Sequence, residues 1–181
     1  MKLVVAVTGA TGAIYAQRAL AALAGRHEVD LVFTKNGRLV WQHEVGVEPG
    51  LPSWNPSDMT APFASGSARY DGMLVIPCTS GTLGRVAHGV STDLVCRAAD
   101  VMLKERRPLV LVLRETPYSL VHIRNMELVT LAGATVMPAT PSFYGKPADI
   151  GALVDTVVSR ALDRLGVPNE LVPRWPEVND D

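Results

Sequence analysis

Residues 2–12 read KLVVAVTGATG, and this stretch decides the fold. Residues 3–7 are all apolar and rich in valine, which is typical of a short buried strand. Gly9 and Gly12 then permit a tight turn, and residues 13–24 follow with the apolar spacing of a helix. A strand that enters a glycine turn and then a helix is the first half of a βαβ unit.

The rest of the chain repeats this alternation of strand and helix. Four further apolar runs predict strands at 29–34, 73–77, 108–113 and 134–137. Helices are predicted at 36–45, from about Thr82, and at 93–104, 119–131 and 150–165. The strands are continuously apolar, which is typical of parallel strands covered on both faces. We therefore predict an α/β fold, a single-domain three-layer α/β/α sandwich with a mostly parallel, Rossmann-like sheet.

Two segments depart from this pattern. Residues 47–66 carry several prolines and glycines, and such a long irregular segment is predicted to be functional or mobile. Residues 167–181 contain three prolines and cannot form a long helix. We expect residues 1–166 to form the domain and residues 167–181 to form a proline-rich C-terminal tail.

Composition excludes several functional classes. The formal net charge of −1 argues against a general nucleic-acid binder. Cys78 and Cys96 are the only cysteines, so neither a disulfide framework nor a structural zinc site is expected. No apolar run reaches the ~18 residues of a membrane span, and no secretory segment is recognised. We expect a cytoplasmic protein. Its low charged fraction of 19% favours a homo-oligomer.

Polar residues follow the predicted strands, where ligands bind in open α/β sheets. The turn 9–12 follows the first strand, Thr34 the second, and Thr79, Ser80 and Thr82 the third. Glycines, hydroxyls and helix-start amides at one edge favour a phosphate-bearing cofactor. The alternative is that these residues only cap helices, which is the better interpretation of any single turn.

The cofactor that fits best is FMN. The turn 8–12 is similar to the glycine turn of short-chain dehydrogenases, but a complete G-x-G-x-x-G is absent. No acidic residue closes the second strand, where NAD requires a carboxylate for its ribose. No tyrosine is followed by a lysine four positions later. FMN carries a single terminal phosphate and makes none of these demands.

Cations suggest a second phosphate site. Arg97 and Lys104 lie seven residues apart on one predicted helix, so they point in a similar direction. Together with Arg114 at a strand end they could cradle a phosphate, and Arg160 could be a fourth member. The alternative is a solvated basic surface. No Asp-Asp-x-x-Asp cluster is present, so no metal site is predicted.

Five blocks of sequence resemble the UbiX-type flavin prenyltransferases, a family formerly described as aromatic-acid decarboxylases. The most specific are ADVMLKERRPLV at 99–110 and RETP at 114–117. The others are GATGAIY at 9–15, PCTSGTL at 77–83 and PATPSFY at 138–144. The resemblance extends from about Lys2 to Trp175 and is weakest over residues 47–66.

The resemblance implies a prenyltransferase that joins a dimethylallyl group from dimethylallyl monophosphate to N5 and C6 of reduced FMN. The product serves a partner decarboxylase of the UbiD type, and members of the family form large homo-oligomers. We expect no nucleic acid, membrane span or metal to be involved.

The resemblance also implies residue roles. The residues that would hold FMN are Gly9, Ala10, Thr11, Thr34, Thr79, Ser80, Gly81, Thr82 and Arg114. The residues that would hold the prenyl donor are Arg97, Lys104, Arg114, Tyr144, Arg160 and Trp175. The catalytic residues would be Glu44, Thr11 and Glu115. Thr11 and Thr34 stand where the family commonly has serine, so each adds a methyl group to the site.

Two alternatives remain open from the sequence. A flavin-dependent cysteine decarboxylase would keep the fold and cofactor, but its Pro-x-Met-Asn block is missing. A flavin-storage or flavin-delivery subunit would bind FMN and catalyse no reaction of its own.

Overall fold

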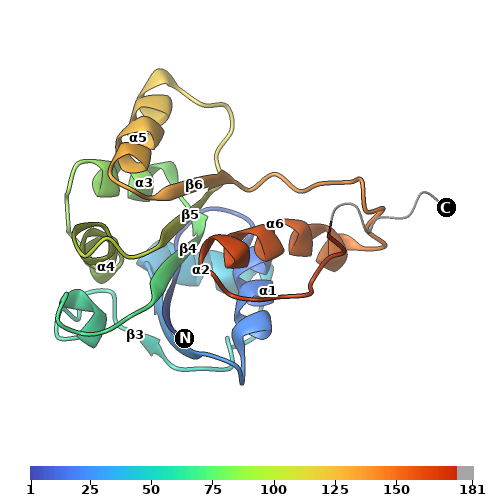
Figure 1. The fold of residues 1–181 in the computed structure, drawn as a ribbon, viewed down its shortest axis with the longest axis horizontal. Coiled ribbons are helices and arrows are strands. Elements are labelled where there is room, and N and C mark those ends of the chain that lie inside the picture. The colour runs from blue at the N-terminus through green and yellow to red at the C-terminus, as the bar shows by residue number, and fades with distance from the viewer. Residues whose placement is uncertain (175–181) are drawn as a thin grey trace.

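A six-stranded parallel sheet lies between two layers of helices in the computed structural model, which describes residues 1–174 (Figure 1). The strands are β1 (Lys2–Val7), β2 (Glu28–Phe33), β3 (Ser53–Trp54), β4 (Gly72–Cys78), β5 (Leu109–Leu113) and β6 (Thr135–Pro138). The helices are α1 (Ala13–Leu23), α2 (Lys35–Glu44), the short 3-10 helix η1 (Pro62–Ala64), α3 (Ser80–Ala87), α4 (Leu94–Lys104), α5 (Leu120–Leu131) and α6 (Ile150–Arg164). The predicted α/β/α sandwich is confirmed.

The two faces of the sheet bury separate hydrophobic clusters. In β1, Leu3 and Val5 face one cluster while Val4 and Ala6 face the other, because side chains alternate along a strand. The first cluster joins the sheet to α1, α2 and α6, and the second joins it to α3, α4 and α5. Figure 1 shows α1 and α6 on the opposite side of the sheet from α4 and α5.

The strand order is β3-β2-β1-β4-β5-β6. The chain builds outward from β1 to β3, then crosses back to place β4 on the other side of β1. The exits of β1 and β4 therefore form the topological switch point, where open α/β sheets bind their ligands. The turn 9–12 leaves β1 at this point and the turn 79–82 leaves β4 there.

The segment 47–66 is packed more closely than its composition predicts. It contributes the edge strand β3 and the helix η1, and Phe63 is fully buried. Trp54 donates its indole N–H to Asp30 at 2.7 Å, and the Tyr70 hydroxyl donates to the same carboxylate. We expected a functional or mobile loop here. The segment instead has a structural role, because it supplies the strand at one edge of the sheet.

A buried ion pair connects the two helices of the first layer. Arg18 of α1 donates two hydrogen bonds to Asp155 of α6, whose side chain is 6% exposed. We expect Asp155→Ala to lower the free energy of unfolding by about 2–3 kcal/mol, less than for a fully buried pair, because half-exposed Arg18 can turn to water. Denaturant unfolding measures the loss. Glu127→Ala breaks an exposed pair with Arg124 and should cost under about 0.5 kcal/mol; equal losses in the two variants would contradict the assignment.

None of the helices in residues 1–174 is long and apolar enough to cross a membrane.

Candidate functional site

Two of the predicted hydroxyls cap helices. Thr34 accepts a hydrogen bond from the Gly37 amide, and Thr79 accepts one from the Thr82 amide, each at 3.0 Å. The Thr82 side chain is almost fully buried. Thr34 and Thr79 therefore cap helices, as the alternative interpretation expects, and this role does not exclude contact with a ligand. Capping uses the hydroxyl as an acceptor, so Thr34 can still donate its proton to a ligand, whereas Thr79 already donates to the Thr82 hydroxyl at 2.9 Å.

Backbone amides at the start of α3 offer the anion site instead. The amides of Ser80 and Gly81 have no acceptor within residues 1–174. Gly81 is exposed, and a Cβ atom built on it would be 3.8 Å from its nearest neighbour, the Arg85 side chain. Unpaired amides at a helix start, beside the switch point, are suited to a phosphate group. The residues present therefore fit the phosphate of FMN.

Glu44, at the end of α2, reaches across to the turn that follows β1. Its carboxylate accepts hydrogen bonds from the Thr11 hydroxyl at 2.5 Å and from the amides of Gly12 and Ala13 at 2.8 Å. Loss of hydration raises the pKa of Glu44, but these three hydrogen bonds outweigh it and lower the pKa below its usual value. The structure thus brings together Thr11 and Glu44, which are 33 residues apart in sequence, and keeps the carboxylate ionised.

Gly9 is required by this close approach of α2. A Cβ atom at Gly9 would lie 2.5 Å from the Cβ of Asn36, so any side chain there would push α2 away from the turn. Displacing α2 would move Glu44 with it.

Glu115 faces the same edge of the sheet from the exit of β5. It accepts a hydrogen bond from the Ser80 hydroxyl at 2.8 Å and one from the Thr116 amide at 3.0 Å, and these bonds lower the pKa of its carboxyl. Glu115 and Arg114 line a cavity of 380 Å³ together with Thr140. The structure therefore joins the exits of β4, β5 and β6, as the sequence predicts.

Tyr144 and Arg160 form a separate part of the predicted site. Both line a small cavity of 110 Å³, which residues 171–173 close from the other side. Arg160 also pairs with Asp163 at 3.2 Å, and Arg174 pairs with the same carboxylate. The C-terminal tail is thus fastened to α6 beside these two residues. Trp175 lies outside the described residues.

Arg97 and Lys104 lie elsewhere, on the opposite face of the sheet. Arg97 pairs with Asp100 at 2.7 Å and donates to the carbonyl of Ala64 at 3.0 Å. Lys104 pairs with Glu105 at the end of α4, close to where β5 begins. Lys104 is therefore near the amino edge of the sheet, while Arg114 is at its carboxyl edge. The cradle predicted from four cations is not formed within one chain.

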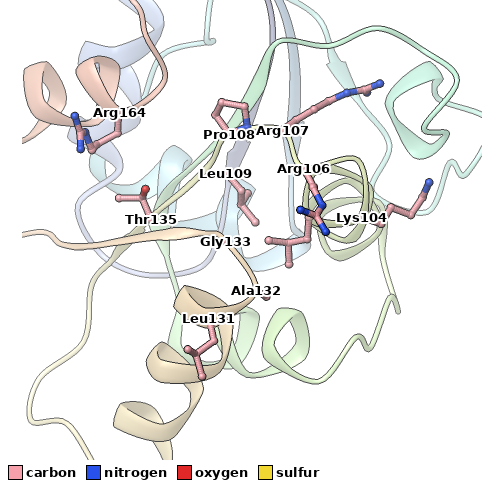
Figure 2. Close-up of a pocket in the computed structure, with 11 residues that line it drawn as sticks. Lys104, Arg106, Arg107, Pro108, Leu109, Leu131, Ala132, Gly133, Thr135 and Arg164 are labelled. Carbon is pink, nitrogen blue, oxygen red and sulfur yellow. The ribbon is translucent and has the colours of Figure 1, made fainter.

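A larger cavity, of 780 Å³, lies at the amino edge of the sheet (Figure 2). Four cations line it, but Figure 2 shows Lys104 and Arg107 directed away from Leu109. Arg107 donates instead to the carbonyls of Gly66 and Ala68. The ends of α4, α5 and α6 meet here, and cations are favourable at helix C-termini. The basic character of this cavity therefore follows from the helix ends.

Sequence reasoning missed Thr8, which joins the two turns at the switch point. The sequence places Thr8 between the first strand and the glycine turn, and no sequence signal marks its hydroxyl as a link to another strand. Within residues 1–174, no three His, Cys, Asp or Glu side chains are grouped so that they could hold a metal ion.

Comparisons with known proteins agree with this geometry. The model of the family described as Flavoprotein matches residues 1–162. The flavin prenyltransferase UbiX of Methanothermobacter thermautotrophicus is 42% identical over 180 residues, covering 96% of this chain and 94% of the relative. A solved structure of AnUbiX in complex with FMN and dimethylallyl pyrophosphate is 44% identical, with a TM-score of 0.93 and 96% of each chain covered.

A second similar solved structure is an oligomer. A dodecameric FMN-dependent UbiX-like decarboxylase from Escherichia coli is 40% identical, with a TM-score of 0.92, and the match covers 97% of this chain and 99% of the other.

A parallel sheet with helix-start amides at its switch point, matched over most of its length by this family model, defines a flavoprotein. Within that class, the chain belongs to the UbiX family of flavin prenyltransferases. The preference for FMN over NAD and the expectation of a prenyltransferase are confirmed. The family relationship does not support the cysteine decarboxylase alternative.

Proposed function

We propose that this protein joins the dimethylallyl group of dimethylallyl monophosphate to reduced FMN, at N5 and C6 of the flavin. Bound reduced FMN supplies the nucleophilic ring atoms, and the protein supplies binding and electrostatic stabilisation. The observation that carries the proposal is the ionised Glu44 carboxylate, held by Thr11 and the start of α1 beside the switch point.

The turns 9–12 and 79–82 would hold FMN, with the unpaired amides of Ser80 and Gly81 facing its phosphate. Arg114, exposed at the exit of β5, adds a positive charge at the same edge. The Thr34 hydroxyl could donate to this group. Thr79 and Thr82 would contact it through backbone atoms, because the Thr79 hydroxyl donates to Thr82 and the Thr82 side chain is buried.

Glu44 would stabilise the transfer step. When the bond from the allyl carbon to the phosphate oxygen breaks, positive charge develops on the allyl carbon, and a nearby carboxylate lowers the energy of that state. Thr11 holds the carboxylate in place and is the nearest hydroxyl through which a proton could pass to it. Glu115 would orient Ser80, whose hydroxyl donates to its carboxylate, beside Arg114.

The donor phosphate would be held by residues of more than one chain. Arg97 and Lys104 are on one face of the sheet, and Tyr144 and Arg160 are on the other. A single phosphate can contact both groups only where chains meet. The proposal agrees with the dodecameric state of the Escherichia coli relative. Cationic side chains would then neutralise the departing phosphate without a metal ion.

We further propose that the prenylated flavin is delivered to a UbiD-type decarboxylase in the cytoplasm. The support is the family relationship, because the product of this reaction is a modified cofactor that needs a recipient enzyme.

Incubation of the protein with reduced FMN and dimethylallyl monophosphate, without metal, tests the proposal. We expect the flavin released by denaturation to gain the mass of one prenyl unit. The control contains isopentenyl monophosphate, an isomer whose phosphate ester is not allylic, and should give no gain. Bound but unmodified FMN in both samples would instead support a storage or delivery subunit, and absence of FMN binding would remove the basis of the proposal.

A further inference from the structure

Thr8 forms a buried polar link at the switch point. Its side chain is 1% exposed, at the residue that follows β1. The hydroxyl donates a hydrogen bond to the Pro77 carbonyl and accepts one from the Thr79 amide, each at 2.8 Å. The Thr8 amide also donates to the Pro77 carbonyl, at 3.3 Å. One residue thus connects the exit of β1 to the exit of β4.

The link lies where the regular ladder ends. The register between β1 and β4 covers Leu3–Ala6 on one strand and stops before Pro77 on the other. Proline has no amide hydrogen, so it cannot donate a ladder bond. Beyond that point, bonds made by Thr8 set the spacing of the two exits.

The link continues into the start of α3. Thr79, whose amide is held by Thr8, is the N-cap of that helix and accepts a hydrogen bond from the Thr82 amide. The unpaired amides of Ser80 and Gly81 lie between these two threonines in sequence. Any shift of Thr79 would therefore move the amides that face the ligand.

We propose that Thr8 is a positioning residue for FMN: its hydroxyl fixes the distance between the turn 9–12 and the start of α3. The inference rests on the proposed function, because it assumes that both turns contact the same flavin. Thr8 itself is buried and makes no direct contact with the ligand. It would act on the ligand by holding the Thr79 amide in place.

A series of substitutions tests the role. Thr8→Val keeps the shape but removes both hydroxyl bonds, Thr8→Cys keeps a weak donor and acceptor, and Thr8→Ser keeps the hydroxyl. We expect FMN to dissociate about tenfold or more readily from the valine variant, with cysteine intermediate and serine close to wild type. Quenching of flavin fluorescence on titration into the apoprotein measures each dissociation constant.

A matched control separates positioning from stability. Val110→Ala removes buried volume near the start of β5, away from both turns, and should lower the unfolding temperature while leaving FMN affinity near wild type. FMN affinity unchanged in Thr8→Val, or lowered equally in Val110→Ala at matched loss of stability, would overturn the proposal. If the valine variant does not fold, the other two variants test the proposal: FMN should bind more tightly to Thr8→Ser than to Thr8→Cys, and equal affinities would overturn it. Failure of the wild-type protein to bind FMN would instead refute the proposed function.

Discussion

Glu44→Gln is expected to slow prenyl transfer by ~10²-fold or more, the usual contribution of a positioned charge or acid–base group. The amide can still accept from the Gly12 and Ala13 amides, so the start of α1 should be preserved. What is lost is the negative charge beside the developing allyl cation and the acceptor for the Thr11 hydroxyl. Single-turnover formation of prenylated flavin measures the effect, with all substrates bound beforehand.

Binding and stability distinguish this role from a structural one. FMN and donor affinities of the glutamine variant should stay close to wild type, and so should its unfolding temperature. Glu127→Gln, on the exposed surface of α5, is the matched control and should leave the rate unchanged. A normal single-turnover rate in Glu44→Gln would assign the charge and proton work to Thr11 and bound water.

The pKa of Glu44 limits the possible mechanism. Its carboxyl is held below its usual pKa, so at neutral pH it is an anion and only a weak base. Electrostatic stabilisation needs the anion and is favoured by this shift. Proton acceptance is disfavoured by the same shift, so the geometry accounts better for electrostatic stabilisation than for a base role.

The sheet could be predicted from sequence because its strands are continuously apolar and its helices follow in strict alternation. The edge strand β3 could not, because two residues of strand carry no periodicity. The burial of Phe63 within a proline-rich segment was missed for a related reason. Local composition indicates a loop, while the cluster with Trp54 and Tyr70 depends on packing between distant segments.

The site could be predicted only at the level of the sheet edge. The exits of the strands share an edge in any parallel sheet, so the meeting of Ser80 and Glu115 followed from topology. The resemblance supplied the separate roles of Thr11 and Glu44, and the hydrogen bond between them was not predicted. Thr8 was missed because a buried hydroxyl at the end of a strand looks like any other strand residue.

The face occupied by Arg160 could not be predicted at all. The helix α4 connects two parallel strands, and the right-handed crossover rule fixes its face of the sheet. The helix α6 follows the edge strand β6 and leads to no further strand within residues 1–174, so that rule does not apply. Only packing against α1, including the pair of Arg18 with Asp155, decides its side.

Because Lys104 and Arg160 lie on opposite faces of the sheet, we predict a second large effect, on binding of the prenyl donor. Lys104→Ala and Arg160→Ala should each raise the donor concentration needed by about 10- to 100-fold, because each removes a charge-assisted contact to the phosphate. Binding of FMN should survive in both, since neither side chain lies at the switch point. With donor held low, both variants are expected to be nearly inactive.

Mixing the two variants should restore activity. If Lys104 of one chain and Arg160 of another meet at one site, random oligomers of equal parts contain about a quarter of sites with both residues intact. A site within one chain would gain nothing. The control mixes wild type with the double variant: sites shared between chains again leave about a quarter intact, whereas sites within one chain leave about half. Coexpression of differently tagged chains, followed by purification on both tags, provides the mixed oligomers. No recovery in the first mixture and half activity in the second would show that each chain holds its own donor phosphate, and would require a movement of α4 or α6 that the present geometry does not contain.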